Sequence, residues 1–125
     1  MKSSDNVRKN PTFWKSTIIA ARGFFLVLQS ERKVRLAIAV AFIFCVLAVC
    51  VKVSYMEILF MAFAWIQVVV GEIFNTSLEK AMDYASGKEF HPLIKRGKDY
   101  AAGSVFVLSV FATSLSLYFL GTKVF

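Results

Sequence analysis

Three long runs of apolar residues dominate the chain, and none of them contains a charged side chain. They cover residues 36–51, 58–71 and 100–122. A helix needs about 20 mainly apolar residues to cross the hydrocarbon core of a bilayer. The third run reaches that length unaided, and the first two reach it by including flanking interfacial residues. The pattern therefore predicts three transmembrane helices, at residues 34–53, 55–86 and 100–122.

The second predicted helix is too long to end inside the membrane. No helix breaker interrupts residues 55–86, and the Ser86-Gly87 pair that follows is typical of a helix stop. A helix of this length measures roughly 45 Å, whereas the hydrocarbon core is about 30 Å thick. We therefore expect its C-terminal part to extend into the cytoplasm, where residues 87–99 would form a polar loop before the third span.

The segment before the first span has a different pattern. Residues 11–30 mix Phe, Trp, Ile and Leu with Lys15, Arg22 and Gln29, so that their apolar part is too short and too interrupted to cross a bilayer. Proline at position 11 is typical of a first helical turn. We predict an amphipathic helix that lies at the membrane surface, with Trp14 at the level of the headgroups.

Composition and charge support an all-α integral membrane protein in a single domain. The chain has 125 residues, is 58% hydrophobic and carries a formal net charge of +7. Nearly all the lysines and arginines precede the first span or lie between the second and third; the exceptions are Lys52 and Lys123. The positive-inside rule then places the N-terminus in the cytoplasm and the C-terminus outside. Topology and anionic lipids explain the basic charge, so nucleic-acid binding is not needed to account for it.

Four polar residues lie on one face of the second predicted helix, just beyond its apolar part. Their spacing is i, i+3, i+7 and i+11, and a turn of about 100° per residue puts all of them on one stripe. They are Glu72, Asn75, Glu79 and Asp83. Carboxylates crowded on one face repel one another unless a cation or a proton joins them. The stripe therefore predicts a functional site, where a bound cation or a proton relieves the repulsion between the carboxylates.

Depth in the membrane separates the roles of these residues. If Glu57 marks the outer interface, Glu72 lies roughly 22 Å further in, at the inner edge of the hydrocarbon. A carboxylate at that depth is energetically costly and is a candidate general base for a lipid hydroxyl. Glu79 lies in the aqueous zone and is better placed to hold a divalent cation. Glu31 sits at the same level, and Mg²⁺ usually takes one or two carboxylates together with phosphate oxygens.

Plainer readings exist for several of these residues. Glu31 is also consistent with a solvated charge at a helix end, and Asp83 with a simple surface ion pair. His91 precedes a proline, as loop residues often do, and Lys98 is one of the cytoplasmic positive charges. No glycine-rich phosphate-binding loop is present. A rival class is a small membrane transporter or pore protein, but a transporter needs its acid near the middle of the bilayer.

The motifs resemble those of a known family. Residues 72–83 resemble the signature E-x-x-N-[ST]-[SA]-[LIV]-E-x-x-x-D of the prokaryotic diacylglycerol kinase family. Residues 91–103, which read H-P-L-I-K-R-G-K-D-Y-A-A-G, resemble its second block. Arg22-Gly23 and Ser30-Glu31-Arg32 resemble its N-terminal region. The resemblance covers roughly residues 13–122, and the two motif blocks occur in the same order as in the family.

The resemblance implies a bacterial plasma-membrane lipid kinase with a surface helix, three membrane helices and a homotrimeric assembly whose subunits share active sites. Glu72 would be the general base, and Glu31 and Glu79 would bind the Mg²⁺ of Mg·ATP. The remaining matched residues would position ATP: Asn75, Asp83, His91, Lys98 and Asp99. One subgroup phosphorylates diacylglycerol to phosphatidic acid, and another converts undecaprenol to undecaprenyl phosphate. The second block looks more like the undecaprenol subgroup, so undecaprenol is the expected substrate and diacylglycerol the alternative.

Overall fold

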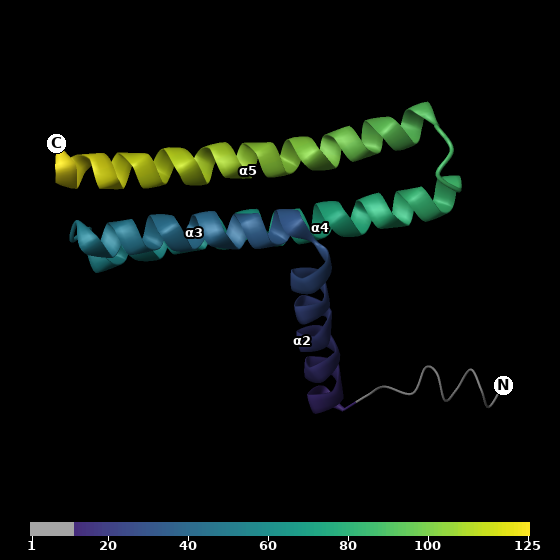
Figure 1. The fold of residues 1–125 in the computed structure, drawn as a ribbon, viewed down its shortest axis with the longest axis horizontal. Coiled ribbons are helices and arrows are strands. Elements are labelled where there is room, and N and C mark those ends of the chain that lie inside the picture. The colour runs from purple at the N-terminus through teal and green to yellow at the C-terminus, as the bar shows by residue number, and fades with distance from the viewer. Residues whose placement is uncertain (1–11) are drawn as a thin grey trace. The chain divides into compact units, whose positions relative to one another are not determined.

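The computed structural model describes residues 12–125, which form four helices and no strand. The helices are α2 (Phe13–Ser30), α3 (Arg32–Cys50), α4 (Tyr55–Ser86) and α5 (Pro92–Val124) (Figure 1). The chain divides into two compact units at residue 30, so that α2 belongs to the first and the three longer helices to the second. The start predicted for α2 at residue 11 lies outside the described residues.

The three helices of the second unit are long and apolar enough to cross a membrane. Many of their large apolar side chains are exposed, including Phe42, Phe63 and Phe106. Exposed apolar surface of this extent is stable when the surrounding medium is lipid. The fold is therefore that of an all-α integral membrane protein, as the sequence predicted. Nothing in α2 is buried, and its location at the membrane surface stays a prediction.

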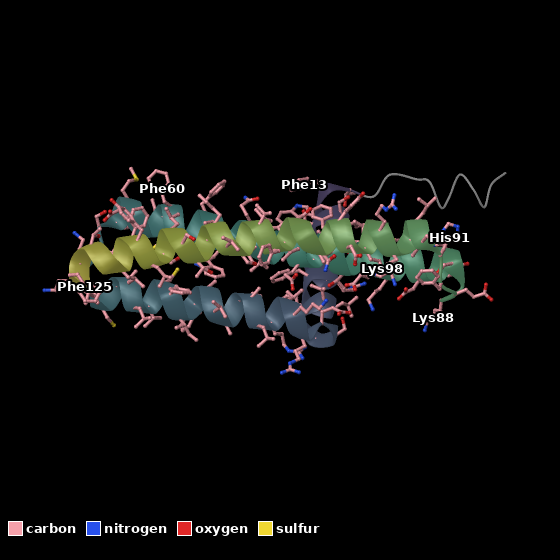
Figure 2. All side chains as sticks on the ribbon, turned by 90° about the horizontal axis from the view of Figure 1, so that it is seen from above. Phe13, Phe60, Lys88, His91, Lys98 and Phe125 are labelled. Carbon is pink, nitrogen blue, oxygen red and sulfur yellow. The ribbon has the colours of Figure 1, made fainter. Side chains whose placement is uncertain are left out.

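Helix α4 packs against both α3 and α5, and the interior of the bundle lies along it (Figures 1 and 2). The indole ring of Trp65 on α4 stacks on Phe44 of α3, with ring centroids 5.4 Å apart. Its Nε1–H donates a buried hydrogen bond of 2.9 Å to the Ser116 hydroxyl on α5. One side chain thus joins all three helices. A second buried cluster around Met61 and Ala48 packs nearer the α3–α4 turn.

The turn between α3 and α4 is short and well specified. Lys52 adopts the left-handed conformation, with φ of 62°. Ser54 then caps α4, because its hydroxyl accepts a hydrogen bond from the Glu57 amide while the Glu57 carboxylate accepts one from the Ser54 amide. This reciprocal arrangement satisfies two amides that have no partner within the helix. Helix α4 then continues without a break from Tyr55 to Ser86, the bounds expected from the sequence.

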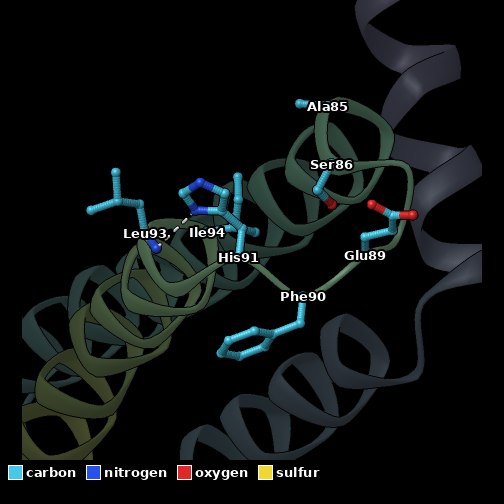
Figure 3. Close-up of a pocket in the computed structure, with 7 residues that line it drawn as sticks. All are labelled: Ala85, Ser86, Glu89, Phe90, His91, Leu93 and Ile94. Carbon is cyan, nitrogen blue, oxygen red and sulfur yellow. Dashed lines mark hydrogen bonds between the residues drawn. The ribbon is translucent and has the colours of Figure 1, made fainter.

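The other end of α4 stops at Gly87, whose left-handed φ of 62° costs a glycine less energy than a residue with a Cβ. The connection to α5 is shorter than predicted. A loop was expected over residues 87–99, but α5 begins at Pro92, so residues 92–99 are helical. His91 caps this helix by accepting the Leu93 amide on Nδ1 at 3.2 Å (Figure 3). The loop was inferred from polarity alone, and polar residues outside a membrane can form a helix when a cap and a first-turn proline start it.

The bounds of α3 also differ slightly from the sequence estimate. The sequence predicted residues 34–53, whereas α3 begins at Arg32, directly after Glu31, and ends at Cys50. The charged residues at its start are helical although they are polar. Glu31 occupies the N-cap position with an extended backbone. This places Glu31 and the first turn of α3 beside α4, where the predicted site residues lie.

Candidate functional site

The polar stripe on α4 is intact because the helix runs through it without interruption. Its members differ in burial. Asn75 is only 4% exposed, Glu72 is half-buried, and the side chains of Glu79 and Asp83 are 39% and 41% exposed. Asn75 is therefore the one shielded member of the stripe, whereas its three carboxylates are all partly exposed.

Two ion pairs join the stripe to the start of α3. The Lys80 ammonium lies 3.1 Å from a carboxylate oxygen of Glu31, and the Lys33 ammonium lies 3.8 Å from one of Glu79. Each helix therefore supplies one acid and one lysine to the other. The carboxylates predicted to bind a metal, Glu31 and Glu79, are brought to the same α3–α4 contact, as their common depth suggested.

A third ion pair joins the stripe to α5. Lys98 donates a hydrogen bond to the Asp83 carboxylate. This hydrogen bond, helped by the positive charges of Lys98, Lys88 and Lys80, holds the pKa of Asp83 below its usual value. Asp99 pairs instead with Lys95 of its own helix, at 2.8 Å. The Asp83–Lys98 contact fixes the register of the first turns of α5 against the last turns of α4.

Glu72 differs from the other two carboxylates of the stripe because no cation within the described part of the chain pairs with it. It lines a groove of about 360 Å³ formed by α3, α4 and α5. Apolar side chains make up most of the groove below it, among them Leu36, Trp65 and Val68, and Lys33 also lines it. A carboxylate without a counter-charge, at the top of an apolar groove, is suited to accept a proton from an amphiphile's hydroxyl.

Four of the predicted nucleotide and metal residues line a second pocket, of about 370 Å³. They are Glu79, His91, Lys98 and Asp99. Lys95 and Phe90, which the sequence analysis did not single out, line it too. His91 also lines a neighbouring hollow with Phe90 and Glu89 (Figure 3), and its Nδ1 is engaged by the Leu93 amide. Nε2 is therefore the ring nitrogen left for a ligand.

The other three residues predicted to bind the nucleotide or the metal do not line this pocket: Glu31, Asn75 and Asp83. Glu31 pairs with Lys80 at the α3–α4 contact, and Asp83 pairs with Lys98, which lines the pocket. Asn75 is buried one helical turn before Glu79. The sequence analysis did not single out Lys33, which lines the groove and pairs with Glu79. Its position two residues after Glu31 and its positive charge were the signals that could have indicated it.

The divalent cation that the sequence analysis predicted stays a prediction, and its expected protein ligands, Glu31 and Glu79, both lie at the α3–α4 contact. No group of three or more His, Cys, Asp or Glu side chains within residues 12–125 is arranged to hold a metal ion. A pair of carboxylates, Glu31 and Glu79, matches the usual protein contribution to Mg²⁺ when phosphate oxygens complete the shell. In addition, the side-chain oxygen of Asn75 is buried and has no hydrogen-bond partner among residues 12–125. Such an orphaned acceptor is unusual, and Asn75 lines neither the groove nor the charged pocket.

The fold and the site together define an all-α membrane protein with a charged two-part site at one end of its helical bundle. A family model described as "Prokaryotic diacylglycerol kinase" matches residues 18–120, which include every predicted site residue. The chain therefore belongs to the prokaryotic diacylglycerol kinase family and is a lipid kinase, a phosphotransferase. A search of curated proteins and a search of solved structures each found no match.

Proposed function

We propose that this protein transfers the γ-phosphoryl group of Mg·ATP to the hydroxyl of a membrane lipid alcohol, with undecaprenol as the main substrate. The observation that supports the proposal is the division of the site along α4. Glu72, which pairs with no cation of the described helices, lines an apolar groove, and Glu79 lines a charged pocket. Seven residues separate them, which is about 10 Å along a helix. A lipid hydroxyl and a nucleotide can therefore approach each other along one helix face.

In the proposed reaction, the Glu72 carboxylate accepts the proton of the lipid hydroxyl as that oxygen attacks the γ-phosphorus. A bond forms between the lipid oxygen and phosphorus, and the bond between phosphorus and the bridging oxygen of ADP breaks. The products are a lipid phosphate, ADP and a proton on Glu72 that is later released to water. Because phosphoryl transfer needs little covalent chemistry from the protein, positioning and charge neutralisation supply most of the catalysis.

The remaining predicted residues would act on the nucleotide. Glu31 and Glu79 would hold Mg²⁺, which supplies charge neutralisation to the phosphates. The ammonium of Lys98, oriented by its pair with Asp83, would lie beside phosphate oxygens in the charged pocket. The other residues assigned to nucleotide binding are Asn75, His91 and Asp99. Asn75 would use its unpartnered buried oxygen as a hydrogen-bond acceptor.

The preference for undecaprenol rests on residues 91–103, whose H-P-L-x-K-x-x-K-D-x-A-A-G form resembles the undecaprenol subgroup. Diacylglycerol is the alternative acceptor, and the product would then be phosphatidic acid. The apolar groove beneath Glu72 is compatible with the hydrocarbon of either lipid. The rival function, a small transporter or pore, is disfavoured because the acids of the proposed site gather toward one end of the bundle rather than along its apolar middle.

The proposal extends to the cellular setting. Lysine and arginine are concentrated before α3 and between the apolar parts of α4 and α5, which supports a cytoplasmic N-terminus and an external C-terminus. We place the protein in the bacterial plasma membrane, where its substrates would meet cytoplasmic ATP. A homotrimer with shared active sites is part of the same proposal. It is supported by the family resemblance and by the small residues Ala101, Ala102 and Gly103 on α5, which allow close helix approach.

The proposal is tested with purified protein in detergent, radiolabelled Mg·ATP and one lipid at a time. Undecaprenol is expected to be phosphorylated faster than diacylglycerol at equal concentration. The control lipids are the O-acetylated forms of each, which keep the hydrocarbon but lack a free hydroxyl, and these should receive no label. Faster labelling of diacylglycerol would reverse the substrate assignment. Label transfer to neither alcohol would contradict the lipid kinase proposal and favour the transporter.

A further inference from the structure

Lys33 occupies the junction between the two halves of the site. Its side chain lines the groove that contains Glu72, and its ammonium pairs with Glu79, which lines the charged pocket. We propose that Lys33 is a further catalytic residue, which binds the γ-phosphoryl oxygens while the phosphoryl group moves from ADP to the lipid. This inference rests on the proposed function and adds to it a residue that neither the family signature nor the spacing of the acids indicated.

The position of Lys33 in the fold allows this role. It lies in the first turn of α3, which begins at Arg32, and its side chain is 59% exposed. The distance of 3.8 Å between its ammonium and Glu79 is longer than a hydrogen bond. Exposed pairs of this kind contribute little to stability. The lysine is therefore held near Glu79 but not fixed there, and its long side chain can turn to a stronger acceptor.

If Glu79 bound Mg²⁺, the Lys33 ammonium would leave Glu79 and move toward the phosphate groups of the nucleotide. With its carboxylate free, Glu79 attracts the Lys33 ammonium, and the pair is neutral. If the same carboxylate ligates Mg²⁺, the dication repels the ammonium, because like charges a few ångströms apart interact unfavourably. The nearest available anions are then the phosphate oxygens that share the metal. Glu79 thus keeps Lys33 at the reaction centre until the nucleotide arrives.

The chemistry of a lysine suits the proposed step. The ammonium is a compact charge that donates up to three hydrogen bonds. It would stay protonated throughout, since Glu72 receives the only proton that moves. The bond to the lipid oxygen forms and the bond to ADP breaks as in the proposed reaction. Lys33 would neutralise charge on the oxygens of the transferred group, where preorganised donors have their largest effect on rate.

The competing explanation is that Lys33 only ties α3 to α4. Lys80 provides a matched control for it, because Lys80 also pairs with a predicted metal carboxylate across the same helix contact, at 3.1 Å from Glu31. Lys80 is not among the residues that line either the groove or the charged pocket. If charge or helix contact alone mattered, replacing either lysine would have the same consequence. If the γ-phosphoryl contact matters, only Lys33 will affect it.

The test compares the equilibrium binding of two magnesium nucleotides to the purified protein in detergent. One is the ATP analogue with a methylene group between its β- and γ-phosphorus atoms, which cannot transfer its phosphoryl group, and the other is ADP. The wild type is expected to bind the triphosphate analogue more tightly. Lys33→Gln should weaken binding of the analogue roughly tenfold, the scale of one charge-assisted hydrogen bond, with little effect on ADP. Lys33→Arg should keep most of the preference, and Lys80→Gln should leave the ratio of the two affinities unchanged.

The outcomes are distinguishable. A Lys33→Gln protein that retains the wild-type ratio, or a Lys80→Gln protein that loses it, would overturn the assignment of Lys33. Equal wild-type affinities for the two nucleotides would do the same. A wild type that binds neither nucleotide would instead contradict the proposed function itself. If Lys33→Gln does not give folded protein, as judged by its thermal unfolding, Lys33→Ala is measured in the same assay with the same expected loss of preference.

Discussion

Lys98 donates a hydrogen bond to Asp83, and this ion pair joins the first turns of α5 to the last turns of α4. The two residues are 15 positions apart in the sequence, on either side of the short loop at residues 87–91. Because the pair lies beside the pocket that also contains Glu79, His91 and Asp99, it positions the start of α5 relative to the acidic stripe. Its loss is expected to affect both stability and nucleotide binding.

The Asp83–Lys98 pair predicts a dependence of stability on acid. The Lys98 hydrogen bond lowers the pKa of Asp83 in the folded protein, so the charged carboxylate is favoured by folding. Its stabilising contribution is present above the unfolded pKa of about 3.9 and is lost as the pH falls through the lower folded value. We expect Asp83→Asn to unfold at a lower temperature than the wild type at about pH 6, with the difference shrinking near pH 3.

Thermal unfolding in detergent across this pH range measures the effect. Glu89→Gln is the control, because Glu89 is an exposed acid of the adjacent loop with no ion pair among the described contacts. It should unfold near the wild-type temperature at every pH. A difference between Asp83→Asn and the wild type that grows as the pH falls would show that the sign is wrong.

The Trp65–Ser116 hydrogen bond predicts a modest loss of stability on removal. Trp65→Phe keeps an aromatic ring against Phe44 but removes the Nε1–H donor. Hydrogen bonds between membrane helices contribute about 0.6 kcal/mol on average, with a maximum near 1.7. The loss also includes packing, because phenylalanine is smaller than tryptophan.

A double-mutant cycle with Ser116→Ala separates the two contributions. Removing the serine hydroxyl after Trp65→Phe should destabilise the protein less than removing it from the wild type, since the hydrogen bond is already gone. The measurement is the free energy of unfolding in mixed micelles. Strictly additive losses would mean that the hydrogen bond adds nothing to the stability of the bundle.

If Glu72 is the general base, replacing it should lower turnover without changing nucleotide affinity. Glu72→Gln retains the size and polarity of the side chain but cannot accept the proton of the lipid hydroxyl. Turnover should fall by roughly 10²–10⁴, the usual contribution of a general base, while the affinity for Mg·ADP stays near that of the wild type. Glu57→Gln is a suitable contrast: its amide oxygen can still accept the Ser54 amide in the cap of α4, so stability and turnover per folded protein should both stay near the wild-type values. Unchanged turnover in Glu72→Gln would remove Glu72 from the mechanism.

Glu79 predicts a change in the response to Mg²⁺. Replacing its carboxylate by an amide in Glu79→Gln removes a charged oxygen that hard cations prefer. The Mg²⁺ concentration for half-maximal phosphorylation should rise severalfold at fixed ATP. The Mg²⁺ titration is compared with that of Glu89→Gln, whose acid lines the same pocket but is not paired with a helix lysine. If both variants respond to Mg²⁺ as the wild type does, Glu79 is not a metal ligand.

Hydropathy and helical periodicity are local properties, and they predicted the membrane fold well. The three spans were expected where α3, α4 and α5 form, and the stripe from Glu72 to Asp83 was expected on one face of a continuous helix. The wrong prediction of a long loop before α5 also came from a local property of the sequence. Polarity suggested a loop over residues 87–99, whereas the cap at His91 and the proline after it start α5 eight residues earlier.

The sequence by itself determined the helices, their membrane character and the order of acids along α4, because each follows from residues within a few turns of one another. Only the tertiary structure decided which side chains meet across helices. The pairs Lys33–Glu79, Lys80–Glu31 and Lys98–Asp83 depend on the rotation and register of packed helices, which spacing along one helix does not specify. The same packing leaves Glu72 without a cation from residues 12–125, and it puts Lys33 both in the groove and beside Glu79 of the charged pocket.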